Sequence, residues 1–262
     1  MAKNGIDLST WNDVYDYGKL LKDQDFVMIR AGFGFNTIDN RMNKHIAGCK
    51  ANKKPYGFYW FSYAMDVESA KKEAKFFVDL IKDVADPVLP LYFDWEYASD
   101  DYARKHGVIV NSDLLKKMAL AFCNIVSDAG YTAGVYCNPD YISRYYGEGF
   151  FRYYDFSLWL AEWGARPSYE CDIWQFSEKG QLDGVQGNVD LDLCFLDIPG
   201  TKSDKELDQI LEELIDEYDD ICFGILQGKY GAGAERKEQL GKYYEVAQEL
   251  INQAYKRKEG LF

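Results

Sequence analysis

Histidine is scarce in this 262-residue chain, which has only two, and no two cysteines show the Cys-x-x-Cys spacing of a zinc site. His45 and Cys49 stand four residues apart, but no second pair joins them. We interpret this spacing as coincidence and expect no metal and no cofactor. The six cysteines (49, 123, 137, 171, 194 and 222) lie scattered and mostly inside apolar segments, which is typical of buried free thiols rather than a disulfide framework.

Long hydrophobic runs and excess positive charge are also missing. No stretch approaches the roughly 20 apolar residues of a membrane span, and residues 1–4 lead directly into a strand-like segment, which leaves no room for a signal peptide. We therefore expect no membrane insertion. The net charge of −13 argues against a nucleic-acid partner, because such binding depends on lysine and arginine neutralising phosphates.

Strand-like and helix-like segments alternate through the first 200 residues, which predicts an α/β fold. The short intervals between the last strands leave no room for full crossover helices. Repeated strand–helix units favour a parallel sheet, and eight strands allow it to close, so we expect an irregular β/α barrel of about eight strands and five helices. The predicted strands are 5–8, 26–33, 56–63, 89–95, 132–137, 156–161, 171–176 and 189–195, and the predicted helices are 12–21, with Asn12 or Asp13 as cap, 40–51, 66–84, 112–129 and 139–146.

The composition changes near Pro199-Gly200, and residues 201–204 have the character of a short linker. Beyond it the pattern is helical, with one helix near 205–226, a glycine-rich break at 228–233 and two further helical stretches. We therefore divide the chain into a barrel over 1–200 and a small three-helix module over 201–262.

Carboxylates recur where the predicted strands end, at Asp7, at Asp94 and Glu96, and at Asp190 with Asp192. In a β/α barrel this end carries the chemistry. Asp94 and Glu96 share one strand face, with α-carbons roughly 6 to 7 Å apart. At that separation two charges repel by roughly 2.5 kcal/mol, enough to raise one pKa by about two units. One carboxyl can then donate a proton while the other stays anionic, as glycoside hydrolysis requires. The alternative is a pair of solvated strand-end carboxylates.

Aromatic residues make up 16% of the chain and concentrate in the strand 56–63 and near the other strand ends. Sugar rings stack on aromatic faces, so an acidic cleft lined in this way suits a saccharide; barrel core is the alternative. Arg30 interrupts an apolar strand, where it either contacts substrate or neutralises the carboxylates. Our candidate substrate-binding residues are Arg30, Tyr59, Phe61, Tyr136 and Trp163.

Seven short motifs occur in order along residues 4–197 and together resemble glycoside hydrolase family 25, the Chalaropsis-type lysozymes. They are Gly5-Ile6-Asp7-Leu8-Ser9, Gly57-Phe58-Tyr59-Trp60-Phe61, Asp94-Trp95-Glu96, Gly134-Val135-Tyr136, Leu158-Trp159-Leu160-Ala161, Ile173-Trp174-Gln175-Phe176 and Gly187-Asn188-Val189-Asp190-Leu191-Asp192. The resemblance implies an irregular β/α barrel that hydrolyses the β-1,4 bond between N-acetylmuramic acid and N-acetylglucosamine in bacterial peptidoglycan.

The same resemblance assigns roles to the carboxylates. Glu96 matches the general acid, Asp94 its partner, and Asp7 and Asp190 match two further acidic residues of the cleft. Asp192 lies on the same strand face as Asp190, so either residue can be the terminal acid. Many members carry histidine where Trp60 stands, and we assign Trp60 no catalytic role.

Residues 228–240 are similar to the short repeat of the wall-binding modules found behind phage lysozymes, which usually reads G-K-W-G-x-G-x-E-R-K, with Tyr230 in place of tryptophan. We expect Tyr230 to stack on the ligand and Arg236 to bind a carboxylate; an ordinary interhelical turn is the alternative. The two resemblances together predict a phage endolysin, made in the host cytoplasm and acting on the cell wall after release. A bacterial autolysin would look the same.

Two rival functions remain from the sequence. A non-catalytic carbohydrate-binding barrel would keep the aromatic residues but lack the paired carboxylates, which are present. A glycosidase acting on another N-acetylglucosamine polymer, such as chitin, would keep the acid pair and differ in its product. The oligomeric state does not follow from the sequence.

Overall fold

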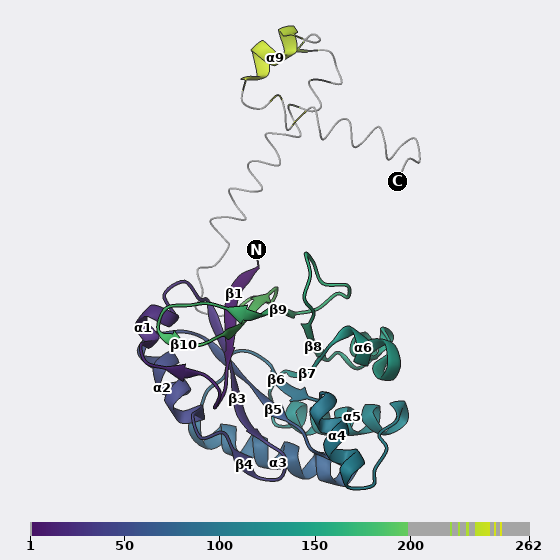
Figure 1. Cartoon of the computed structure of the whole chain (residues 1–262). Coiled ribbons are helices and arrows are strands. Elements are labelled where there is room, and N and C mark those ends of the chain that lie inside the picture. Colours follow the sequence, from purple (N-terminus) through teal and green to yellow (C-terminus); the bar gives the residue numbers. More distant parts are fainter. Residues whose placement is uncertain are drawn as a thin grey trace. The chain divides into compact units, whose positions relative to one another are not determined.

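The computed structural model describes residues 2–198 and, beyond them, residues 221, 225, 229–230, 234–241, 244 and 247. Packing contacts divide the chain into two compact units, Met1–Thr201 and Lys202–Phe262. Figure 1 shows the strands and helices of the first unit and the single labelled helix, α9, of the second.

Eight strands of the first unit close into a barrel. The neighbours follow the order β1-β11-β9-β8-β7-β6-β5-β3, and β3 pairs in turn with β1, which closes the ring. The mixed α/β barrel predicted from the sequence is therefore confirmed. The ring strands are β1 (Lys3–Leu8), β3 (Phe26–Phe33), β5 (Tyr56–Phe61), β6 (Leu91–Asp94), β7 (Ala133–Cys137), β8 (Ser157–Ala161), β9 (Ile173–Gly180) and β11 (Val189–Cys194). The short strand β4 (Thr37–Ile38) pairs antiparallel with β3, and β2 (Asp13–Val14) pairs with β10 (Val185–Gln186).

The strand β11 departs from the expected parallel sheet, because it runs antiparallel to both β1 and β9. Residues 181–188 connect β9 to β11 without a helix. A parallel connection needs a crossover of a dozen or more residues, so this short link forces the chain to return antiparallel. The reversal places Asp190 directly opposite Asp7 of β1.

Helices cover the outside of the barrel, and α3 and α5 pack side by side there (Figure 1). The side chain of Asp66 caps α3 by accepting from the Ser69 backbone N–H at 2.7 Å, and the face predicted at Ala70, Ala74, Phe77 and Ile81 is buried. The helices are α1 (Tyr17–Leu20), α2 (Met42–Ala51), α3 (Val67–Val84), α4 (Tyr97–Lys105), α5 (Ser112–Asp128), α6 (Pro139–Tyr141), the π-helical turn η1 (Ile142–Tyr146) and α7 (Gly149–Tyr154).

Three features of this layer differ from the prediction. The helices α4 and α7 were not expected, because α4 has few apolar residues and α7 is a short aromatic run. The predicted helix 12–21 is reduced to α1, whose cap is Asp16 and not Asn12 or Asp13. Asp13 belongs instead to β2, whose pairing with the distant β10 overrides the local helical pattern.

Trp60 faces the helical layer. Its side chain is fully buried, and its ring centroid lies 5.6 Å from that of Phe77 on α3. A β-carbon on Gly32 of β3 would lie 2.5 Å from the Trp60 ring, so this position has no space for a larger residue. Since alternate residues of β5 point to opposite faces, Tyr59 and Phe61 face the barrel interior.

The second unit contains α9 (Ala234–Leu240) and a small apolar cluster of Ile221, Ile225, Leu240 and Ala247, against which Tyr230 and Tyr244 pack. Most of the predicted three-helix module, including residues 201–220, lies outside the described residues. Over the described residues, no helix is long and apolar enough to cross a membrane.

Candidate active site at the barrel mouth

The predicted acidic residues meet at the barrel mouth, the end where the parallel strands finish. Asp7, Asp94, Glu96 and Asp190 all line one pocket of about 330 Å³. They come from β1, the end of β6, the residue that caps α4, and β11. Three predicted aromatic residues also line this pocket, Tyr59 and Phe61 from β5 and Tyr136 from β7. Arg30 of β3, another predicted residue, lines it as well.

A second pocket, of about 550 Å³, continues the first. It shares Glu96, Tyr136, Gln175 and Asp190 with its neighbour and is bordered by Trp163, whose side chain is half exposed. The two pockets therefore form one cleft, and the shared residues mark its centre. Every barrel residue that the sequence analysis assigned to the site lies in this cleft.

Burial raises the pKa of the four predicted carboxyls in the cleft, those of Asp7, Asp94, Glu96 and Asp190. The pKa of Glu96 rises to about 7, first through burial and then through the charge of Asp190, while Arg30 opposes the shift. The pKa of Asp190 rises to about 6, through burial and then the charge of Glu178. Asp7 and Asp94 have pKa values well above their usual range, again chiefly because both are buried.

This pattern differs from the simple pair expected between Asp94 and Glu96. The sequence argument keeps one carboxyl of the pair anionic, whereas burial raises the pKa of both. Asp94 is almost fully buried, and its Oδ1 has no hydrogen-bond partner among the described residues. The charge that raises the pKa of Glu96 comes from Asp190, across the cleft, because folding brings β11 beside β1. The spacing of residues along one strand cannot predict this interaction, because Glu96 and Asp190 belong to separate elements.

Arg30 has a partner that the sequence analysis missed. Its Nε donates to Oδ2 of Asp39 at 2.8 Å, and both side chains are buried. The guanidinium also lies over the ring of Phe33, 5.6 Å from its centre. Arg30 therefore forms its ion pair with Asp39, which lies outside the cleft. It does not pair directly with the clustered carboxylates, which was one of the two roles expected for it. The positive charge of Arg30 still acts on the pKa of Asp94 and of Glu96. It lowers both values and so offsets part of the increase that burial causes.

Gln175 and Trp159 are cleft residues that the sequence analysis quoted only within motifs. The Gln175 Nε2 donates to Oδ2 of Asp7 at 2.7 Å and to Oδ2 of Asp190 at 3.3 Å, and its Oε1 accepts from the Tyr136 hydroxyl at 2.9 Å. Trp159 packs edge-to-face against both Tyr59 and Tyr136. The sequence pattern that could have identified Gln175 as a site residue is a polar amide between apolar residues in a central strand.

Asp190 and Asp192 occupy different depths of the barrel. Asp190 lines both pockets of the cleft, whereas Asp192 lines neither. Asp192 is almost fully buried, and its Oδ1 accepts from the Trp159 indole N–H at 2.8 Å. The structure thus places Asp190 at the mouth and Asp192 in the interior, beneath the aromatic residues.

The residues considered for a metal site are part of the packed core. The two ring nitrogens of His45 contact the Tyr17 hydroxyl at 2.6 Å and the Ser9 carbonyl at 3.0 Å. Over the described residues, no group of three or more histidine, cysteine or acidic side chains is arranged to hold a metal ion. The five described cysteines are free thiols, and Cys222 lies outside the described residues.

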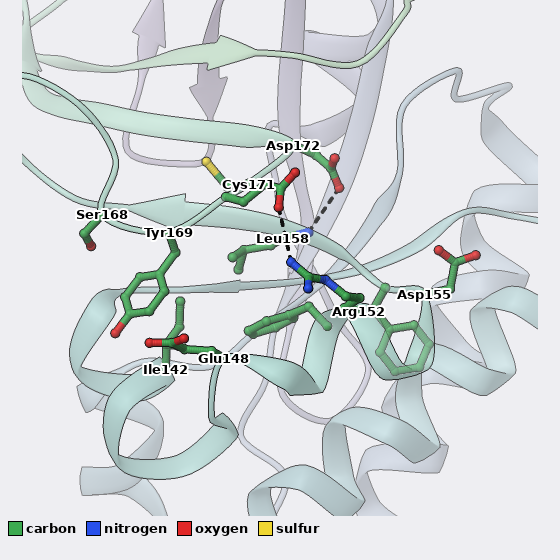
Figure 2. Close-up of a pocket in the computed structure, with 12 residues that line it drawn as sticks. Ile142, Glu148, Arg152, Asp155, Leu158, Ser168, Tyr169, Cys171 and Asp172 are labelled. Carbon is green, nitrogen blue, oxygen red and sulfur yellow. Dashed lines mark hydrogen bonds and ion pairs between the residues drawn. The ribbon is translucent and has the colours of Figure 1, made fainter. Parts of the chain in front are cut away.

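A separate pocket lies beside α7 and the beginning of β8, and Figure 2 shows its lining. Arg152 forms an ion pair there with Glu170 at 3.5 Å, and Asp172 accepts from the Leu158 backbone N–H at 3.3 Å. None of the predicted site residues lines this pocket. Both pockets have aromatic lining residues, but the acidic residues of this one are exposed or half-buried, whereas Asp7 and Asp94 at the mouth are buried.

In the second unit, Tyr230 is half-buried against the apolar cluster, and the Lys229 ammonium lies 5.3 Å from its ring centre. Part of its ring is therefore already covered, and less of it is free for stacking than the sequence suggested. Arg236 lies half-buried on α9. Gly228 and residues 231–233 of the predicted ligand loop lie outside the described residues.

Comparison with known families decides the classification of the barrel. Residues 6–185 match the family Glycosyl hydrolases family 25, and this match covers more than half of the chain. The chain belongs to glycoside hydrolase family 25. The matched region contains Asp7, Asp94 and Glu96 and ends five residues before Asp190.

Individual relatives match the chain at low sequence identity. The chain is 24% identical over 206 residues to the uncharacterised protein YegX of Escherichia coli K12, covering 72% of this chain and 68% of YegX. It superposes on the autolysin LytC of Streptococcus pneumoniae with a TM-score of 0.65 and 23% identity, covering 74% of this chain and 47% of LytC. The spore cortex lytic enzyme SleM of Clostridium perfringens gives a TM-score of 0.61 and 22% identity, covering 74% and 67%. The chain thus spans about half the length of LytC.

Proposed function

We propose that this family 25 barrel is a peptidoglycan hydrolase, a Chalaropsis-type muramidase that cleaves the β-1,4 bond between N-acetylmuramic acid and N-acetylglucosamine. The observation that carries the proposal is the position of Glu96, a carboxyl with a pKa near 7 at the centre of a cleft with aromatic walls on both sides. LytC has been crystallised with a synthetic peptidoglycan ligand, which supports the choice of substrate.

In this proposal Glu96 protonates the oxygen of the scissile bond. Below a pH of about 7 the carboxyl carries its proton, and it lies where the two halves of the cleft meet. One sugar ring then occupies the half with Tyr59 and Phe61, and the next lies beside Trp163. The carboxyls of Asp94 and Asp190, once ionised, stabilise positive charge that develops at the anomeric carbon.

The products released from purified bacterial cell walls test this proposal. After digestion and borohydride reduction, mass spectrometry identifies which sugar carried the new reducing end. Reduced muramic acid is the expected result. Reduced glucosamine would instead indicate a glucosaminidase, cleavage of chitin without cleavage of walls would indicate another polymer, and no release from either would favour a carbohydrate-binding barrel.

We further propose that residues 201–262 bind the cell wall and that the protein acts as an endolysin after release from the cytoplasm of a host. The compactness of the second unit and the position of Tyr230 and Arg236 on it support this role. Attachment raises the local concentration of a polymeric substrate. A chain ending at Gly200 should keep its turnover on soluble muropeptides and clear intact cells more slowly. Equal clearing of intact cells by both chains would contradict the binding role.

A further inference from the structure

A single uncharged side chain joins the acids on the two neighbouring strands β1 and β11. Gln175 is almost fully buried, and it is one of the few residues that line both halves of the cleft. Its amide group contacts Asp7 at 2.7 Å and Asp190 at 3.3 Å, while Glu96 lines the same centre of the cleft.

The orientation of this amide is determined by its third contact. The Tyr136 hydroxyl donates to Oε1 at 2.9 Å, so the two N–H groups of Nε2 face the carboxyls of Asp7 and Asp190. The ring of Tyr136 is itself packed edge-to-face with that of Trp159, with centroids 4.8 Å apart. Rotation of the amide would present an oxygen to two carboxyl oxygens, which is unfavourable in a buried site.

A neutral donor suits this position better than a charged one. The Arg30 guanidinium forms an ion pair with Asp39, and a second such cation between Asp7 and Asp190 would favour the ionised form of both. The amide fixes the positions of the two carboxyls while it changes their protonation much less. Asp190 therefore stays close enough to Glu96 to raise the pKa of that carboxyl.

On the basis of the proposed function, we infer that Gln175 is a positioning residue, which holds Asp190 and Asp7 in place beside Glu96, and that Tyr136 sets its orientation. Gln175 does not touch the scissile bond in this scheme. It acts through the carboxyls, and its loss lets Asp190 turn away from Glu96. The charged and titratable groups around this amide are Asp7, Arg30, Tyr59, Asp94, Glu96, Tyr136, Glu178, Asp190 and Asp192.

The variant Gln175→Met keeps the length of the side chain and removes its hydrogen bonds. We expect kcat to fall on the order of 10²-fold with little change in KM, because the substrate still binds while the carboxyls are misplaced. The basic limb of the pH profile should move to lower pH, since Glu96 loses the effect of Asp190. Gln186→Met, at an exposed position of β10, is the matched control and should match the wild type.

Two more variants separate positioning from packing. Tyr136→Phe removes only the hydroxyl that orients the amide, and its effect should not add to that of Gln175→Met, because both act through one hydrogen bond. Gln175→Glu should be least active relative to the wild type at neutral pH and recover as the pH falls, since a protonated carboxyl donates a hydrogen bond again. A role in packing alone predicts neither result.

A measurement that does not depend on activity keeps this inference distinct from the proposed function. In the full chain, carbon NMR titration of the aspartate carboxyls should show the pKa of Asp7 rising in Gln175→Met, because a donor to its charged form is lost. This holds even if the enzyme cleaves another polymer. Unchanged titration of Asp7 and Asp190, or a lower kcat with an unmoved pH profile, would overturn the inference.

Discussion

Two glutamates of this barrel, Glu96 at the mouth and Glu73 in the helical layer, have the same pKa of about 7 and different surroundings. Burial is the main cause of both shifts. Glu73, on α3, accepts from the Ser62 hydroxyl at 2.6 Å and from the Tyr63 backbone N–H at 3.1 Å. Glu96 instead borders both halves of the cleft and faces the charge of Asp190.

The comparison shows that a raised pKa is first of all evidence that a carboxyl is buried. It does not by itself show that the carboxyl has a catalytic role. Both oxygens of Glu73 are occupied by the end of β5, so this carboxyl fixes α3 to the barrel and lines none of the described pockets that form the cleft. Access to a substrate and a neighbouring carboxyl distinguish Glu96. Perturbed titration identifies an active site only together with geometry of this kind.

The largest expected difference between the two glutamates is in activity. Glu96→Gln should lower the rate on purified cell walls by about 10² to 10⁴-fold, the usual contribution of general acid catalysis. Glu73→Gln is the matched control, with the same change of charge at a similar pKa, and should stay within a few fold of the wild type. Equal losses in both variants would show that the comparison is wrong.

In the pH dependence of stability the two glutamates should behave alike, because the pKa of each is raised to about 7. A carboxyl whose pKa is raised from 4.5 to about 7 on folding binds more protons in the folded state, so it lowers the free energy of unfolding as pH rises through that window. Fully ionised, Glu73 costs about 3 kcal/mol. Urea unfolding at pH 5 and pH 8 should show a smaller loss in Glu73→Gln than in the wild type. A loss of equal size in both would contradict the shift.

The basic limb of the pH profile should follow Glu96 and not Glu73. A general acid must be protonated, so kcat/KM should fall about tenfold for each unit of pH above about 7. Steady-state rates on soluble muropeptides measure this limb. The Glu73→Gln variant should show the same limb, and a shift of the limb in that variant would assign the observed titration to the wrong glutamate.

Chelation is expected to have the smallest effect. Neither glutamate is expected to bind a metal, so activity on cell walls should be unchanged in EDTA. Loss of activity that zinc or magnesium restores specifically would mean that the acidic residues of the mouth form a metal site.

Local sequence patterns predicted the barrel well because each strand is bounded by turns and each long helix has one apolar face. The strand predicted at 26–33 matches β3, and the helix predicted at 66–84 matches α3 within one residue. Pairing between distant segments was not predictable in this way. The strand β2 at Asp13–Val14 and the pairing of β11 with β1 depend on partners more than a hundred residues away in the sequence.

The candidate site likewise has one part that the sequence could predict and another that it could not. Strand ends and family motifs identified Asp7, Asp94 and Glu96, because the identity of these residues is visible locally. The contacts that set their properties connect separate strands. The pairing of Arg30 with Asp39 forms across a local turn, whereas the contact of Gln175 with Asp7 forms only when the barrel closes.

The leaving group of the substrate provides the most direct test of the claim that Glu96 donates the proton. An aryl glycoside whose phenol leaves without protonation needs no general acid, whereas a sugar leaving group does. The account predicts that Glu96→Gln retains most of its rate on the aryl substrate while it loses 10² to 10⁴-fold on the natural glycan, and that Glu73→Gln is nearly unchanged on both. Equal losses on the two substrates in Glu96→Gln would contradict the assignment of Glu96 as the acid.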